Sequence, residues 1–150
     1  MKRWVFFDMD NTLAALYDIP NWLSMLRAYD PAPYAEAEVM LNMNLLARYL
    51  NRLQEAGYQI GIISWLSKCP TPEYDEAVTT AKLAWLKKHL RSVNWDAIRI
   101  VSYGTPKSTF KESEFDILFD DEKRNRDEWG ETAYEPGQIF EIIKDILSTD

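Results

Sequence analysis

Cysteine is almost absent from this 150-residue sequence, and long apolar runs are missing altogether. The single cysteine, Cys69, excludes an intrachain disulfide framework and is typical of a reducing compartment. No apolar run approaches the ~20 residues that a membrane span needs. The run from Val5 to Phe7 is too short for a signal peptide and stops at Asp8, so we expect a cytoplasmic protein without a membrane partner.

Positive charge is also scarce. Seventeen Lys and Arg residues face 24 Asp and Glu residues, which gives a formal net charge of −7. A surface for extended nucleic acid would carry a basic excess, so we do not expect such a partner. A small phosphorylated molecule needs only local positive charge, and carboxylates in an acidic chain can hold divalent cations. The oligomeric state is left open, a monomer included.

What the sequence does contain is an alternation of apolar strands and amphipathic helices. Such alternation predicts an α/β, Rossmann-like fold of three layers with a central parallel sheet. No repeat, low-complexity tract or linker is visible, so residues 1–150 are expected to form one domain, with a small helical cap insert at about 14–35. The expected strands are 3–7, 58–63, 97–102, 116–119 and a short one at 132–134. The expected helices are 23–26, 36–56, 71–90, 107–113 and a closing helix around 139–146.

Four short polar clusters each follow an apolar strand or the loop after one. The clusters are Asp8-x-Asp10-x-Thr12, Ser64, Lys107 and Asp120-Asp121. Ligands of an open parallel sheet bind outside the carboxyl ends of its strands. We therefore expect residues more than 100 positions apart to converge on one site.

The residue types in these clusters suit phosphoryl transfer. Carboxylates gathered at one point repel each other, and a divalent cation such as Mg²⁺ relieves that repulsion through hard oxygen ligands. One carboxylate can then attack phosphorus, and a second can protonate the leaving oxygen and activate water. Lys107 can neutralise the transferring group, and the Ser64 hydroxyl can hold its other oxygens.

In these clusters the sequence resembles the haloacid dehalogenase-like (HAD) superfamily of hydrolases. The resemblance spans positions 4 to about 130, and its strength lies in the order of four motifs rather than in any single one. The motifs are Phe6-Phe7-Asp8-Met9-Asp10-Asn11-Thr12-Leu13, Ile62-Ile63-Ser64, Lys107 and Ile117-Leu118-Phe119-Asp120-Asp121.

The resemblance implies a role for each matching residue. Asp8 would be the nucleophile, and Asp10 the general acid and base, with its backbone carbonyl on Mg²⁺. Ser64 and Lys107 would bind the phosphate. The metal ligands would be Asp8, Asp10, Asp120 and Asp121, with either Asp120 or Asp121 in direct contact. The second acid, Asp10, points to the phosphatase branch, because the dehalogenases of the family lack it.

Several residues depart from the family pattern or compete for a role. Asn11 replaces the common glycine after the second acid, which Asn can do because it tolerates unusual backbone angles. Lys68 is a rival or auxiliary phosphate contact, and Lys111 is a weaker rival of Lys107. The insert at 14–35 is smaller than many caps of the family, so it would leave the site comparatively open.

Other residues have a functional and a structural interpretation. Asn125 either orients the metal carboxylates or is an exposed helix residue. The aromatic residues of the insert either stack on a base or sugar or pack the insert onto the core; they include Trp22, Tyr29 and Tyr34. His89, the sole histidine, lies near a helix C-terminus, where positive charge is favourable.

The leading hypothesis is an Mg²⁺-dependent phosphomonoester hydrolase acting through an aspartyl-phosphate on Asp8. Its substrate would be a small phosphorylated metabolite, with nucleoside monophosphates as first candidates. The alternatives are a receiver-like phospho-switch, a non-catalytic binding module and a phosphatase of nucleic-acid ends. A receiver would place its acidic pair after the first strand and its phosphorylated Asp later, whereas here the adjacent pair Asp120-Asp121 comes late.

Overall fold

The computed structural model describes residues 3–68 and 70–149, so Cys69 lies outside the described residues. The strands are β1 (Trp4–Phe7), β2 (Gln59–Trp65), β3 (Ala97–Val101), β4 (Ile117–Phe119) and β5 (Ala133–Tyr134). The α-helices are α1 (Trp22–Arg27), α2 (Ala32–Glu36), α3 (Met43–Glu55), α4 (Pro72–His89), α5 (Lys123–Trp129) and α6 (Ile139–Thr149). The 3₁₀ helices are η1 (Leu16–Asp18), η2 (Lys107–Phe110) and η3 (Pro136–Gln138). Within the described ranges, no helix combines the length and apolar character that crossing a membrane demands.

The five strands form one parallel sheet in the order β3-β2-β1-β4-β5. The central strand β1 pairs with β2 through Val5 and Ile60, and with β4 through Val5 and Ile117. The chain builds β2 and β3 on one side of β1 and then crosses over to build β4 and β5 on the other. The winding therefore reverses between β1 and β4. A reversal of this kind opens a crevice at the carboxyl ends of the two strands.

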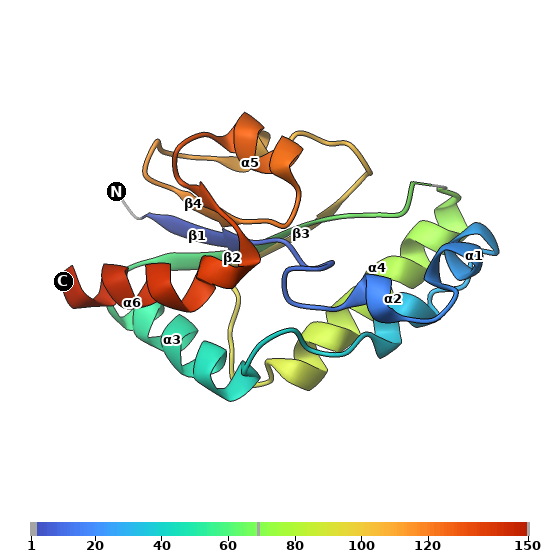
Figure 1. The fold of residues 1–150 in the computed structure, drawn as a ribbon, viewed down its shortest axis with the longest axis horizontal. Coiled ribbons are helices and arrows are strands. Elements are labelled where there is room, and N and C mark those ends of the chain that lie inside the picture. Colours follow the sequence, from blue (N-terminus) through green and yellow to red (C-terminus); the bar gives the residue numbers. More distant parts are fainter. Residues whose placement is uncertain (1–2, 69, 150) are drawn as a thin grey trace.

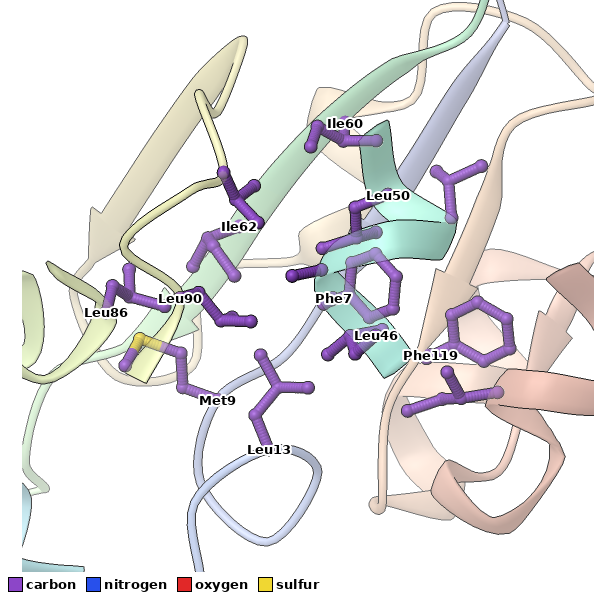
Figure 2. Packing of buried hydrophobic residues seen from close by; sticks show 14 of the residues in the cluster. Phe7, Met9, Leu13, Leu46, Leu50, Ile60, Ile62, Leu86, Leu90 and Phe119 are labelled. Carbon is purple, nitrogen blue, oxygen red and sulfur yellow. The ribbon is translucent and has the colours of Figure 1, made fainter. Parts of the chain in front are cut away.

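Two apolar layers enclose the sheet because side chains along a strand alternate between its faces. From β1, Val5 and Phe7 enter a large cluster with helices α3, α4 and α6, whereas Trp4 and Phe6 join Trp129 of α5 on the opposite face. Figure 1 shows α3 and α6 on one side of the sheet and α5 on the other. Figure 2 shows the larger cluster, with Phe7 beside the α3 side chains. The predicted α/β Rossmann-like fold of three layers is confirmed.

Residues 14–35, expected to form a cap insert, fold into η1, α1 and α2. Leu16, Leu26 and Tyr34 of this segment pack with Tyr74 and Val78 of α4 in a separate apolar cluster. In Figure 1 the insert and α4 lie together, toward the end of the molecule to which the strands point. The insert is thus held beside the carboxyl ends of the strands by its own small core.

The prediction of a helix over residues 36–56 is wrong about where that helix begins. Helix α3 begins at Met43, and the Asn42 side chain caps it by accepting a hydrogen bond from the Leu45 amide at 3.0 Å. Val39 fits the helical spacing but bridges Ala14 in an antiparallel contact, which closes the base of the insert. A side-chain cap and a tertiary bridge therefore override the local apolar period. The C-terminal signal is confirmed, since Gly57 follows α3 with a φ of 98°.

Asp116 is a buried acid with a structural task. Its carboxylate accepts hydrogen bonds from the Trp4 amide at 3.0 Å and the Glu112 amide at 2.7 Å, and from the amide and hydroxyl of Ser113. These bonds tie the first residue of β1 to the loop that precedes β4. The carboxylate thereby aligns the two strands whose opposite ends carry the acidic clusters.

Candidate functional site

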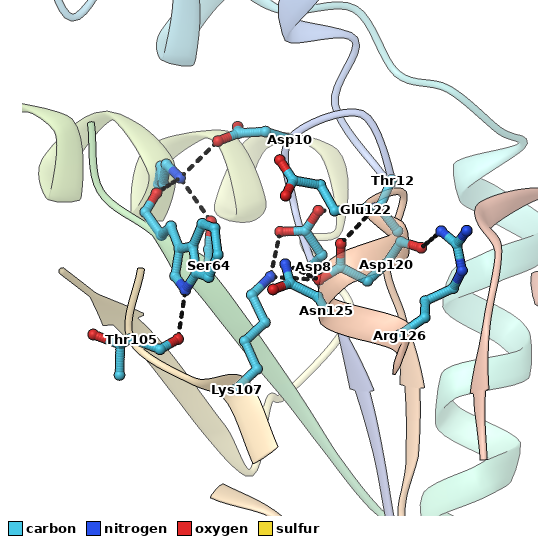
Figure 3. Close-up of polar contacts among 12 residues, drawn as sticks. Asp8, Asp10, Thr12, Ser64, Thr105, Lys107, Asp120, Glu122, Asn125 and Arg126 are labelled. Atoms are coloured by element: carbon cyan, nitrogen blue, oxygen red, sulfur yellow. Dashed lines mark hydrogen bonds and ion pairs between the residues drawn. The ribbon is translucent and has the colours of Figure 1, made fainter. Parts of the chain in front are cut away.

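The acids that follow β1 and β4 meet at the crevice where the winding reverses. The Asp8 amide donates to the Phe119 carbonyl at 2.9 Å, which continues the pairing of the two strands into the site. Between the carboxylates lies the ammonium of Lys107, with its Nζ 2.8 Å from Asp8 Oδ1 and 2.7 Å from Asp120 Oδ2. Figure 3 shows Lys107 reaching up from its loop to both acids. The structure thus brings together three residues that the sequence separates by up to 112 positions.

The turn after β1 orients the Asp8 carboxylate. Asn11 adopts a left-handed conformation with a φ of 60°, as expected for an Asn in place of glycine. The turn brings Thr12 back, and its hydroxyl donates to Asp8 Oδ2 at 3.1 Å. Each Asp8 oxygen therefore accepts a hydrogen bond, one from Thr12 and one from Lys107. Such bonds hold the carboxylate in one orientation at the floor of the crevice.

Asp120 is held in place by the start of α5. Its Oδ1 accepts from the Glu122 amide at 2.9 Å, and its Oδ2 accepts from Asn125 Nδ2 at 3.1 Å. Arg126 donates to the Asp120 backbone carbonyl at 2.9 Å. Asn125 is buried, so of its two interpretations the structure supports the one in which it orients a site carboxylate.

Asp8, Asp120 and Asp121 form an acidic trio, with one oxygen of each lying within 4.8 Å of the others. Burial, followed by the charge of Asp8, raises the pKa of Asp120 and raises that of Asp121 to about 8. Burial alone would lower the pKa of Lys107. The negative charges of Asp8 and Asp120 outweigh that effect and raise its pKa above the usual value. The trio therefore concentrates more negative charge than Lys107 neutralises.

The donor set of the trio fits a hard divalent cation. It offers three carboxylates, which match the oxygen ligands that Mg²⁺ binds. Asn125 Oδ1, which is buried and lines the same cavity, has no hydrogen-bond donor in the part of the chain that the structure describes. A hydrated cation would supply that donor through a bound water. The Asp10 carboxylate lies outside the trio.

Asp10 and Ser64 meet through a residue that the sequence did not single out. Lys82 of α4 donates from its Nζ to Asp10 Oδ2 at 3.0 Å, to Ser64 Oγ at 2.6 Å and to the Trp65 carbonyl at 2.7 Å. The signal was present, because Lys82 follows Val78 by four residues and so falls on the apolar stripe of its helix. A lysine on a buried stripe needs partners, and these three acceptors are its partners.

A cavity of about 280 Å³ opens above these acids. Its floor carries Asp8, Asp10, Lys107 and the acidic pair after β4. Its walls are largely aromatic and apolar and comprise Leu16, Tyr17, Trp22, Leu23, Leu26, Tyr34, Trp65, Leu66 and Tyr103. Burial and the neighbouring acids raise the pKa of the Tyr17 hydroxyl to about 12, so Tyr17 remains a hydrogen-bond donor at the cavity wall.

The remaining candidates divide between the cavity and other places. Lys68 lines the cavity, with its Nζ 5.5 Å from the centre of the Tyr103 ring. Lys111 instead donates to the Trp129 carbonyl at 2.9 Å. Tyr29 packs edge-on against Tyr74, and His89 packs against Trp85. Neither residue belongs to the described residues that line the cavity. Ser64 is fully buried and does not belong to the described residues that line the cavity. Ser67 does line it.

The raised pKa values predict a pH dependence of stability. A carboxyl group whose pKa is raised on folding stabilises the protein while it is protonated, and this contribution is lost as the pH rises from the unfolded to the folded value. Without divalent cations, the protein should therefore lose stability as the pH rises from about 4 to about 8.

Mg²⁺ should oppose this loss, because it would bind the trio in its ionised form. We expect the rise in melting temperature on adding Mg²⁺ to be larger near pH 8 than near pH 5, as measured by thermal unfolding with and without a chelator. The Asp121→Asn variant should show a weaker pH dependence. An equal effect of Mg²⁺ at both pH values would contradict the assignment of the trio as a cation site.

The comparisons with known proteins bear on the fold. No protein-family model matches the sequence, and no curated protein matches it. The crystal structure of D,D-heptose 1,7-bisphosphate phosphatase from Burkholderia thailandensis is similar over 98% of this chain and 99% of that chain, with a TM-score of 0.61 and 15% sequence identity. A likeness at this identity shows the fold. The Rossmann-like α/β fold that the sequence predicts is therefore shared with that structure over nearly the whole of both chains.

Proposed function

We propose that the protein is an Mg²⁺-dependent phosphomonoester hydrolase that works through an aspartyl-phosphate on Asp8. The observation that carries the proposal is the bridge of Lys107 between Asp8 and Asp120, with Asp121 completing an acidic trio at the crevice. The proposed nucleophile, a lysine that can neutralise phosphoryl charge and the proposed divalent-cation site would then lie at one point. The fold shared with a known phosphatase supports the same reaction class.

The reaction would proceed in two displacements. An Asp8 carboxylate oxygen attacks phosphorus, the bond from phosphorus to the ester oxygen breaks, and Asp10 gives its proton to the departing oxygen. Water then attacks the aspartyl-phosphate while Asp10 takes a proton from it, which releases phosphate and restores Asp8. Mg²⁺ held by the trio would neutralise charge on the phosphoryl oxygens. Asp10 suits its role because it lines the cavity, two residues beyond Asp8.

The phosphate would be held chiefly by Lys107, which lines the cavity and already touches Asp8. Ser64 remains a proposed phosphate-binding residue, but its hydroxyl lies beneath the cavity wall and accepts a bond from Lys82. Ser67 lines the cavity three residues further on, and its side chain shares a hydrogen bond with Tyr34. Lys68 stands at the same wall and is the auxiliary cation for a second anionic group on the substrate.

The cavity favours a small substrate whose leaving group carries a flat or apolar part. Its volume of about 280 Å³ suits a metabolite rather than a polymer. Trp22 and Tyr17 of the insert, and Trp65 and Tyr103 of the core, offer aromatic faces to such a group. Nucleoside monophosphates are therefore the first candidates, and the net charge of −7 disfavours an extended nucleic-acid partner.

A panel of phosphorylated metabolites, assayed for phosphate release with Mg²⁺ and with a chelator, tests the proposal. We expect turnover of at least one small monoester with Mg²⁺ and its loss when the metal is removed. Nucleoside monophosphates should rank above sugar phosphates. Equal turnover with the chelator would contradict the metal site. A long-lived acyl phosphate on Asp8 without phosphate release would favour the receiver-like switch instead.

A further inference from the structure

Lys82 is a buried lysine at the centre of the site's polar network. Only 1% of its side chain is exposed, although it lies in the middle of α4. Its ammonium has three protons to donate, and three acceptors surround it: Asp10 Oδ2, Ser64 Oγ and the Trp65 carbonyl. The Tyr34 ring lies 4.9 Å from the same nitrogen. Lys82 thus joins the turn after β1, the end of β2 and the insert.

The contacts of Lys82 argue against direct binding of substrate. Every donor of its ammonium is engaged by protein oxygen, and among the described residues Lys82 does not line the cavity. Lys107, in contrast, lines the cavity and touches the proposed nucleophile. The two buried lysines therefore form ion pairs with different acids. Lys107 pairs with Asp8 and Asp120, and Lys82 pairs with Asp10.

The effect of Lys82 on Asp10 is one of orientation. One Asp10 oxygen, Oδ2, is bound to the ammonium, while the Asp10 side chain keeps 23% of its surface exposed and lines the cavity. Binding one oxygen fixes the plane of the carboxylate and leaves the other oxygen for a group in the cavity. Because Ser64 and the Trp65 carbonyl anchor Lys82 to β2, the position of Asp10 is set from the sheet.

We propose that Lys82 is a positioning residue that holds Asp10 where its carboxyl group can transfer a proton to the leaving oxygen. This inference rests on the proposed function, and it adds a residue outside the four motifs to the reaction. The bond from phosphorus to the leaving oxygen breaks, and the proton from Asp10 neutralises the oxygen that departs. A leaving group that is stable as an anion has little need of that proton, whereas an alkoxide needs it.

The test compares two leaving groups in the Lys82→Met variant. For an alkyl phosphate, kcat/KM should fall about 100-fold or more, which is the scale of general acid catalysis. For nitrophenyl phosphate, whose leaving group is a stable anion, the fall should stay below about 10-fold. The Lys88→Met variant is the matched control, because Lys88 is exposed on the same helix; it should keep both activities. Equal losses on the two esters would overturn the proposal and assign Lys82 a purely structural role.

A double-mutant cycle gives a second readout. If Lys82 acts through Asp10, the Asp10→Asn variant should show the same preference for the nitrophenyl ester, and adding Lys82→Met should cost little more. Additive losses would overturn the proposal. If the methionine variant fails to fold, Lys82→Arg takes its place, because the larger guanidinium keeps the charge but displaces the Asp10 carboxylate. A wild-type protein inactive on both esters would overturn the proposed function, whereas equal losses in an active protein overturn this inference alone.

Discussion

Replacing Asp8 with Asn should lower kcat for phosphomonoester hydrolysis by about 10⁴-fold or more, the scale on which an enzyme loses turnover with its nucleophile. The amide keeps the shape of the side chain and can still meet Thr12, but it cannot form the acyl phosphate. The fold should survive, because the substitution removes one of three crowded negative charges. Steady-state kinetics with Mg²⁺, together with thermal unfolding of the same preparation, measures both expectations.

The control for this experiment is Asp145→Asn, which makes the same chemical change at an exposed position on α6. It should leave kcat and melting temperature unchanged. The Asp8→Asn variant should also lower the pKa of Asp120 and Asp121, because the Asp8 charge contributes to raising both. Phosphatase activity retained in Asp8→Asn would remove Asp8 from the role of nucleophile.

Replacing Lys107 with Met should destabilise the metal-free protein by about 3–5 kcal/mol, the cost of leaving a buried charge without its partner. Lys107 is buried, and its ammonium is shared by Asp8 and Asp120. Since these acids raise its pKa, its stabilising contribution is fully present below the pKa of a free lysine and is lost as the pH rises through the raised value. Urea unfolding near neutral pH, in the presence of a chelator, measures the loss.

Mg²⁺ should restore part of the stability of Lys107→Met, because a cation in the trio supplies some of the missing positive charge. It should not restore activity, since the phosphoryl group would still lack its lysine. Lys111→Met is the matched control, because Lys111 bonds the Trp129 carbonyl on α5 and not the acids. Full activity of Lys107→Met with Mg²⁺ would contradict the phosphate-binding role, and unchanged stability without metal would contradict the ion-pair account.

Predictions from the sequence agree best with the structure where the local residue pattern and the tertiary packing favour the same conformation. β1 was predictable because a continuous apolar run that ends in acids is typical of a buried parallel strand. Gly57 was predictable as the residue after α3 because a positive φ favours glycine. The start of α3 was not predictable. Val39 has the spacing of a helical residue, but it forms an antiparallel bridge with Ala14 at the base of the insert.

Lys82 shows the same limit at the site. Its place on an apolar stripe is visible in the sequence, but its partners lie 72, 18 and 17 positions away on other elements. The motif that contains Ser64 predicts a contact with phosphate. In the structure, the Ser64 hydroxyl instead accepts a hydrogen bond from Lys82 and does not line the described cavity. Motifs report which residue types are present at a strand end, and they do not report which of them reach the surface of the crevice.

By itself, the sequence determined the alternation of strands and helices, the parallel sheet and the acids at the strand ends, because periodicity and residue type are local properties. Tertiary structure alone decided which charges share a partner: Lys107 with Asp8 and Asp120, and Lys82 with Asp10 and Ser64. The physical reason is that a buried ammonium must find its acceptors among side chains from distant elements, and the reversal of winding between β1 and β4 determines which of them lie within reach.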